Sequence, residues 1–188
     1  MRNEVMFAGF GGQGVIKAAL LLAISAGLYE DKEVAQTQSY GPEARGGACR
    51  SEVVISDETI DYIKTMDLDA FVVMSQPALD KYMDSIDPEK TVVIADTTLI
   101  KQPPEHIKHF FPVEATQVAE QEFGQALFAN IVMLGALAAI TGTTSEGSLS
   151  RALEGNVPSK TLEKNRLALK RGYEIGNKLK AESSCTKH

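Results

Sequence analysis

An apolar run passes directly into a glycine-rich turn in Val5-Met6-Phe7-Ala8-Gly9-Phe10-Gly11-Gly12-Gln13-Gly14, and a helix-like stretch from Val15 to Leu28 follows. This order predicts the strand, turn and helix that begin a nucleotide-binding α/β sheet. Glycines at the first, third and sixth positions permit a tight turn, approach of a phosphate to the backbone and close helix-to-strand contact. We therefore predict a cofactor-binding turn formed by Gly9, Gly11, Gly12, Gln13 and Gly14.

The same glycines also have a purely structural explanation, because any tight strand-to-helix connection can use them for geometry alone. A conventional NAD site further needs an acidic residue at the end of the second strand, about 20 residues beyond the glycines, to hold the ribose hydroxyls. Gln36 or Gln38 occupies that position here. A conventional NAD-dependent dehydrogenase is therefore disfavoured.

Length and composition predict one globular domain. The chain has 188 residues, of which 44% are hydrophobic, which is enough for one buried core and short for two. We place the domain at residues 1–182 and a disordered tail at residues 183–188. The net charge of −6 argues against nucleic-acid binding, and no apolar stretch reaches the length of a membrane span. Because the sequence does not start like an export signal, a cytoplasmic protein is expected.

Strands and helices alternate along the sequence, which predicts a three-layer αβα, Rossmann-like domain with a mainly parallel or mixed sheet and a helical C-terminal third. The predicted strands are Glu4–Ala8, Glu33–Gln38, Arg50–Ser56, Ala70–Ser75, Thr91–Ala95 and His109–Val113. The predicted helices after the first are Pro77–Ile86, Ala126–Ile140, Ser145–Leu153 and Ser159–Lys180. Ala126–Ile140 is apolar on nearly every face, so it is expected at the centre of the core, with the Asn130 amide satisfied by neighbouring backbone.

A polar loop between the second and third predicted strands is the other informative stretch. In a parallel sheet this loop and the glycine turn leave the carboxyl ends of their strands, where adjacent loops enclose a ligand crevice. Ser75-Gln76 and Asp96-Thr97-Thr98 end two further strands at the same edge. We assign to a substrate or subunit-interface loop the residues Gln38, Ser39, Tyr40, Gly41, Pro42, Glu43, Arg45, Gly46, Gly47 and Arg50.

Arg45 and Arg50 are the side chains in this loop best suited to a carboxylate or phosphate, since guanidinium offers a planar fork of donors. Either could equally pair with a carboxylate of a partner protein. A structural alternative also stands, because Gly41-Pro42 and Gly46-Gly47 are ordinary turn sequences and the charges between them can be solvent-exposed.

The sequence gives little indication of a metal site or a catalytic nucleophile. The two cysteines, Cys49 and Cys185, form no CxxC motif, so neither a zinc site nor an iron–sulfur cluster is expected from this chain alone. His106 and His109 form a His-x-x-His pair after Pro103-Pro104-Glu105 in an exposed segment, and two solvated histidines are a simpler explanation than a metal site. No serine or cysteine has a neighbouring base, so no catalytic residue is assigned.

The two motifs together resemble the gamma subunit of the 2-oxoacid:ferredoxin (acceptor) oxidoreductases. The residues that carry the resemblance are Gly9-Phe10-Gly11-Gly12-Gln13-Gly14 and Gln38-Ser39-Tyr40-Gly41-Pro42-Glu43-Ala44-Arg45-Gly46-Gly47. The resemblance covers nearly the whole chain, including its length and helical C-terminus. Within the family, the form of the second motif is most similar to the 2-oxoglutarate branch.

The resemblance implies one subunit of an enzyme complex that converts a 2-oxoacid and coenzyme A into an acyl-CoA, here succinyl-CoA, and CO2. It implies alpha and beta subunits as partners, a delta, ferredoxin-like subunit as a further candidate, and ferredoxin or another low-potential acceptor for the electrons. Thiamine diphosphate, Mg and iron–sulfur clusters are expected in those partners. The chain itself has no motif for them, so its role would be subunit assembly and part of a composite active site.

A freestanding Rossmann-like nucleotide-binding or regulatory module is the main alternative. Such a module would use the glycine turn for a phosphate without doing chemistry, and the turn alone is compatible with it. Tight binding of a nucleotide by the isolated chain would favour this alternative.

Overall fold

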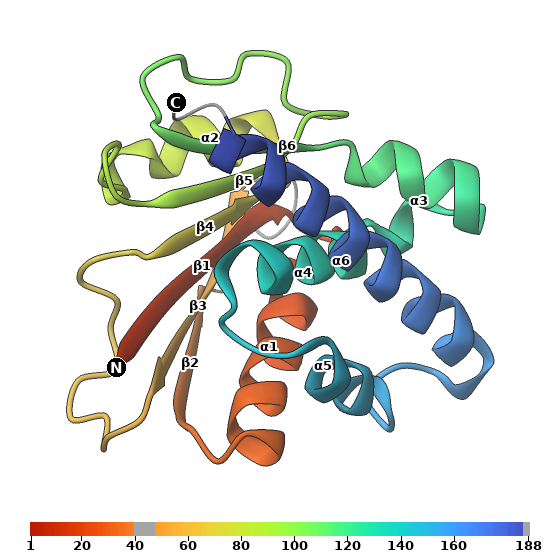
Figure 1. Cartoon of the computed structure of the whole chain (residues 1–188), viewed down its shortest axis with the longest axis horizontal. Coiled ribbons are helices and arrows are strands. Elements are labelled where there is room, and N and C mark those ends of the chain that lie inside the picture. Colours follow the sequence, from red (N-terminus) through yellow and green to blue (C-terminus); the bar gives the residue numbers. More distant parts are fainter. Residues whose placement is uncertain (40–47, 186–188) are drawn as a thin grey trace.

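A mixed β-sheet forms the centre of the protein in the computed structural model, which describes residues 1–39 and 48–185 (Figure 1). The strands lie in the order β2-β3-β1-β4-β5-β6. They span Arg2–Phe10 (β1), Glu33–Ser39 (β2), Ala48–Ser56 (β3), Ala70–Val73 (β4), Val92–Asp96 (β5) and His109–Val113 (β6). The predicted αβα class and mixed sheet are confirmed.

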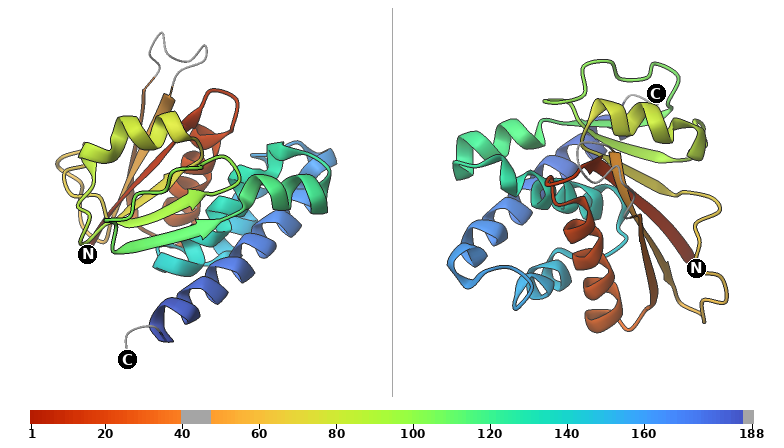
Figure 2. Two further views of the ribbon diagram at one scale, coloured as in Figure 1. Left: turned by 90° about the horizontal axis from the view of Figure 1, so that it is seen from above. Right: turned by 180° about the vertical axis from the view of Figure 1, so that it is seen from behind.

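Strand directions decide which loops meet. β1, β4, β5 and β6 run parallel, whereas β3 is antiparallel to both of its neighbours, β1 and β2. Since β1 and β2 are each antiparallel to β3, they point the same way and their carboxyl ends lie at one edge of the sheet. Figure 2 shows the turn after β1 at the same end of the molecule as the end of β2 and the start of β3.

Helices cover the sheet unequally. The larger hydrophobic core joins one face to α1, α4, α5 and α6, whereas a smaller core joins the other face to α2 (Figure 1). The helices span Val15–Tyr29 (α1), Gln76–Tyr82 (α2), Ala115–Phe123 (α3), Ala129–Thr141 (α4), Glu146–Leu153 (α5) and Leu162–Cys185 (α6). Short 3-10 turns span Met83–Ser85 (η2), Ala126–Phe128 (η3) and Ser159–Thr161 (η4).

α4 is buried on nearly every side, as its apolar sequence predicts. Its packing against α6 depends on glycine, because a Cβ at Gly172 would lie 2.0 Å from the Val132 carbonyl oxygen and one at Gly135 would lie 2.2 Å from the Leu169 carbonyl oxygen. The two backbones therefore touch, which fixes α6 across the molecule.

Some predicted boundaries differ from the structure. The strand predicted to reach Ser75 ends at Val73, because the Ser75 hydroxyl accepts the Ala78 N–H and so begins α2. The helix predicted to reach Ile86 ends at Tyr82 and continues as η2. α3 was not predicted. α6 extends to Cys185, and residues 186–188 lie outside the described part, so the tail at 183–188 stays a prediction. Within the described residues, none of the helices has the length and apolarity to cross a membrane.

Candidate functional site

The glycine turn owes its shape to two left-handed residues. Gly12 has φ of 97° and Gly14 has φ of 76°, a region that side chains with a Cβ adopt only at a cost. Gly14 is also the N-cap residue of α1 and offers no side chain to the helix. Gly12 and Gly14 are therefore needed for the backbone conformation of the turn, which is the structural role that the sequence analysis considered for them.

Gly9 and Gln13 close the turn by packing and hydrogen bonding. A Cβ on Gly9 would lie 2.5 Å from the Gln13 Oε1 and 2.9 Å from the Val15 Cγ1. The Gln13 amide accepts the Phe10 N–H at 2.6 Å and donates to the Met74 carbonyl oxygen at 2.8 Å. Both polar ends of Gln13 are thus engaged inside the protein, which ties the turn to the end of β4.

Asn130 of α4 contacts the glycine turn at Gly14. Its Nδ2 donates to the Gly14 carbonyl oxygen at 3.1 Å, as expected for a buried amide satisfied by backbone, and a Cβ on Gly14 would lie 2.4 Å from that nitrogen. The Oδ1 of Asn130 is buried and has no hydrogen-bond partner among the residues that the structure describes. Gly14 is therefore required both for its φ and for the space that Asn130 occupies.

A pocket of about 490 Å³ lies beside the turn. Most of its lining is apolar or backbone, and Lys17 is the cation among the described residues that line it. The lining residues are Phe10, Gly11, Gly12, Gly14, Val15, Ile16, Lys17, Leu20, Ser39 and Cys49. The pocket thus joins the glycine turn to the end of β2, two of the stretches that the sequence analysis singled out.

The N-terminus of α1 can accept an anion at this pocket. Among the described residues no side chain caps the helix, and its first turn has no acidic residue. The free N–H groups and the positive end of the helix dipole favour negative charge there, and Lys17 adds a formal charge in the first turn. Sequence reasoning missed Lys17, although it is the one charged residue in the α1 sequence VIKAALLLAISAGLY.

The predicted polar loop is described only at its ends. Gln38 and Ser39 finish β2, and Ser39 lines the pocket. Tyr40, Gly41, Pro42, Glu43, Arg45, Gly46 and Gly47 lie outside the described residues. Their assignment to a substrate or interface site stays a prediction.

Arg50 lies on the opposite face of the sheet from this pocket. Adjacent residues of a strand point to opposite faces, and Cys49 faces α1 while Arg50 lies over the Tyr82 ring of α2, 5.3 Å from its centroid. Arg50 Nη1 also lies 3.6 Å from the Glu52 Oε1. The structure therefore does not bring Arg50 together with the glycine turn.

Two further polar clusters at this edge serve as helix caps. Asp96 is fully buried, and its Oδ2 accepts the Thr116 N–H at 3.1 Å and the Thr116 hydroxyl at 2.5 Å at the start of α3. Ser75 caps α2. Both side chains do lie at the carboxyl edge, as predicted, but their polar atoms are used to begin helices.

The described cysteines and histidines do not form a ligand set. Cys49 is buried with its thiol directed to the Gly9 carbonyl oxygen, and burial raises the pKa of that thiol, so it is neutral at pH 7. Cys185 is exposed at the end of α6. In the described ranges no three His, Cys, Asp or Glu side chains converge into a metal site, and His106 is exposed. These residues do not fit an iron–sulfur cluster or a magnesium diphosphate.

Residues 4–175 match the family model described as pyruvate ferredoxin/flavodoxin oxidoreductase. The chain belongs to that family. The match spans the glycine turn, the sheet and most of α6, so the whole fold described above is the family's domain. The resemblance drawn from the two motifs is confirmed.

Three relatives of this oxidoreductase chain place it within the family. It is 48% identical to 2-oxoglutarate synthase subunit KorC of Methanocaldococcus jannaschii, over 95% of this chain and 96% of that one. Identity to pyruvate synthase subunit PorC of Methanothermobacter marburgensis is 32%, over 91% and 96% of the two chains. The crystal structure of the gamma subunit of a keto/oxoacid ferredoxin oxidoreductase from Geobacter sulfurreducens superposes with a TM-score of 0.86 at 36% identity, covering 95% and 98%.

Proposed function

We propose that this chain is the gamma subunit of a multi-subunit 2-oxoglutarate:ferredoxin oxidoreductase. The observation that carries the proposal is the near full-length match to 2-oxoglutarate synthase subunit KorC at 48% identity, against 32% to pyruvate synthase subunit PorC. The complex would oxidatively decarboxylate 2-oxoglutarate with coenzyme A, giving succinyl-CoA and CO2 and passing electrons to ferredoxin, in the cytoplasm.

The cofactors of that reaction belong, in this proposal, to the alpha and beta subunits, and a delta, ferredoxin-like subunit is a further candidate partner. The described residues of this chain do not fit a cluster or a thiamine diphosphate site, so no chemical step is assigned to them. What the chain contributes is a binding surface. The pocket beside the glycine turn would form one wall of a composite active site shared with the partner subunits.

Lys17 and the first turn of α1 would hold an anionic group of coenzyme A or of the 2-oxoacid at that wall. Support comes from the uncapped helix N-terminus and from the position of Lys17 on the pocket. Arg45 stays a candidate for the same role. Arg50, held by Tyr82 and Glu52 on the other face, is better suited to organising the sheet face or a subunit contact.

Reconstitution tests the function directly. The chain is co-expressed with the alpha and beta subunits encoded in the same genome, and reduction of a ferredoxin or viologen acceptor is followed with 2-oxoglutarate or pyruvate. We expect coenzyme A-dependent activity at least about tenfold higher in kcat/KM with 2-oxoglutarate. Failure to recover such a complex, or higher activity with pyruvate, would contradict the proposal.

The anion role is tested in the same complex with Lys17→Met, Arg45→Ala and Arg50→Ala. Loss of a charge that contacts an anion should raise the KM for coenzyme A or 2-oxoglutarate about threefold to tenfold while the complex stays assembled. Lys170→Met, on the exposed side of α6, is the matched control. Unchanged KM values for Lys17→Met would remove Lys17 from the site.

A further inference from the structure

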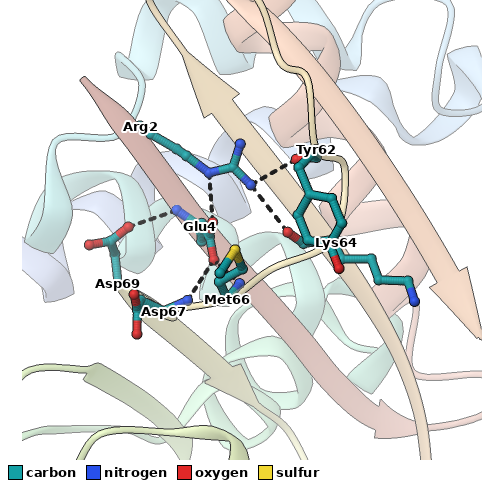
Figure 3. Close-up of polar contacts among 7 residues, drawn as sticks. All are labelled: Arg2, Glu4, Tyr62, Lys64, Met66, Asp67 and Asp69. Carbon is teal, nitrogen blue, oxygen red and sulfur yellow. Dashed lines mark hydrogen bonds and ion pairs between the residues drawn. The ribbon is translucent and has the colours of Figure 1, made fainter.

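The loop between β3 and β4, residues 57–69, is held against the amino end of β1 by one arginine. Arg2 donates to the carbonyl oxygens of Tyr62 at 2.9 Å and Lys64 at 3.1 Å, and its Nε donates to the Glu4 Oε1 at 2.7 Å (Figure 3). Arg2 thus holds the loop backbone at two residues and orients the Glu4 carboxylate beside it.

Glu4 holds the second half of the same loop. The residue is only 4% exposed, and its Oε2 accepts the backbone N–H groups of Met66 and of Asp67, the latter at 2.9 Å. The Glu4 N–H in turn donates to the Asp69 Oδ2 at 2.8 Å (Figure 3). A buried carboxylate is stable only while its donors stay in place, so the loop is rigidly positioned.

This rigid loop presents apolar side chains to solvent. Tyr62 is 51% exposed, Ile63 55% and Met66 73%, although Arg2 and Glu4 hold the loop backbone around them. Three exposed large apolar residues within five positions are unusual for a surface loop and mark a contact site. Because the backbone is already ordered, a partner binding there would lose little conformational entropy.

Two hollows flank Met66. One, of about 510 Å³, lies over β1, β2 and β3 beside Ile63, and the other, of about 380 Å³, lies between the loop and η2. They share Met66, Leu68, Asp84 and Ser85. We call the joined surface the acidic groove and define it by Ile63, Met66, Asp67, Asp69, Asp84 and Asp87.

The two hollows together carry more carboxylates than cations. Among the described residues, three cations line them, Arg50, Lys64 and Lys90, against five carboxylates, Glu52, Asp67, Asp69, Asp84 and Asp87. Arg50 pairs with Glu52. Lys90 lies 3.5 Å from Asp87, and in the described part of the chain neither Asp67 nor Asp84 has an ion pair. Burial, together with the nearby charges of Glu4 and Asp67, raises the pKa of the Asp69 carboxyl. A positive group placed in this hollow would relieve that repulsion.

We propose that the acidic groove docks a segment of an alpha or beta subunit in which an apolar side chain stands beside a lysine or arginine. The apolar side chain would contact Ile63 and Met66, and the cation would lie between Asp67 and Asp84. The inference rests on the proposed subunit role.

A second copy of this chain fits the groove less well. The chain has a net charge of −6, so two copies repel each other over long range. Both arginines of α6 are also engaged within the chain: Arg166 pairs with Glu154 and Glu163, and Arg171 with Glu122. A basic segment of another subunit meets neither obstacle.

The position of the contact is tested by photo-cross-linking in the assembled complex. Benzoylphenylalanine replaces Met66 in one preparation and Leu167, an exposed residue of α6, in a control preparation. After irradiation, mass spectrometry should find Met66 joined to an alpha- or beta-subunit peptide that contains a lysine or arginine next to an apolar residue. A cross-link to a second copy, a peptide without a basic residue, or no cross-link from Met66 would overturn the proposal.

The charge contribution is tested by binding of the purified chain to the remaining subunits. Asp67→Lys/Asp84→Lys should weaken the apparent Kd by at least about tenfold, and added salt should weaken the wild-type affinity. Glu105→Lys, exposed and outside both hollows, changes charge in the same direction and should have little effect. Since the substituted side chains are exposed, unchanged thermal unfolding shows that the fold is intact.

The outcomes separate the two proposals. If the wild-type chain recovers no partner subunits, the proposed function fails and this inference fails with it. If the wild-type complex assembles and is active but Asp67→Lys/Asp84→Lys binds as tightly as wild type, the groove proposal alone is wrong.

Discussion

The two ends of strand β1 are held in different ways. At its carboxyl end the turn is shaped by the main chain, with glycines at left-handed φ and a helix N-terminus facing a largely apolar pocket. At its amino end, Arg2 and Glu4 hold a loop whose contacts lie 60 to 63 residues away in sequence. The first end depends on the absence of side chains, and the second depends on charged side chains in exact positions.

The difference teaches how a site can be recognised. A turn that needs glycine repeats a local pattern, so it is visible in the sequence and is also shared by many folds. A charged network between distant residues has no local pattern, so only the folded chain displays it. Substitutions at the two ends of β1 should therefore destabilise the protein for different physical reasons.

Gly14→Ala should have the largest effect on stability. Alanine at φ of 76° costs about 1–2 kcal/mol, and its Cβ would displace the Asn130 amide and break the hydrogen bond to the Gly14 carbonyl, for a total of about 3 kcal/mol. Urea unfolding measures the loss. Gly12→Ala is the matched control, because its Cβ would meet nothing within 4 Å and only the backbone cost of about 1–2 kcal/mol remains. Equal losses would contradict the role of Asn130.

Glu4→Gln should be nearly as harmful at the amino end. A neutral amide keeps one acceptor but turns an NH2 group toward N–H donors, which leaves Arg2 without its carboxylate and costs about 2 kcal/mol. Hydrogen exchange should quicken at the amides of Met66 and Asp67 but not in the glycine turn. Glu33→Gln, on an exposed position of β2, serves as the control. Unchanged exchange would show that the loop does not depend on Glu4.

Gln13→Ala should have a moderate effect at the carboxyl end. It removes two hydrogen bonds, to the Phe10 N–H and the Met74 carbonyl oxygen, and should lower the free energy of unfolding by about 1–2 kcal/mol. Gln13→Glu keeps the acceptor for the Phe10 N–H but places a carboxylate at the Met74 carbonyl oxygen, so it should be no more stable than Gln13→Ala. A stable Gln13→Glu variant would show that the contact to Met74 is dispensable.

Acid should affect the amino end through Asp57, with the smallest effect. The Lys32 ammonium, and then the N-terminal amino group, lower the pKa of Asp57 from 3.8 to about 2. A carboxyl whose pKa falls on folding stabilises the fold above its unfolded pKa and loses that contribution as pH falls toward 2. The stability difference between wild type and Asp57→Asn should therefore be constant from pH 7 to pH 5, shrink as pH falls from 3.8 to about 2, and vanish only below that. A difference that does not shrink between pH 5 and pH 2 would contradict this assignment.

The sequence alone predicted the αβα fold, the six strands and the family. The spacing of apolar residues within each segment indicates which residues the sheet and its helices bury, and the Gly9–Gly14 pattern indicates the shape of the turn. Both signals come from residues close together in the sequence, so they can be recognised without the fold. α3 was missed because it follows β6 with few apolar residues, and its start depends on the buried Asp96, 20 residues earlier.

Only the tertiary structure decided which side chains share a surface. Arg50 was grouped with the glycine turn because it ends a loop that leaves the same edge of the sheet, but its position in β3 places it on the opposite face, over Tyr82. Lys17 joined the pocket, and Glu4 was found to hold a distant loop, through contacts that no spacing reveals. Backbone form is fixed by neighbours in the chain, whereas the environment of a side chain is fixed by the face it occupies and by what packs there.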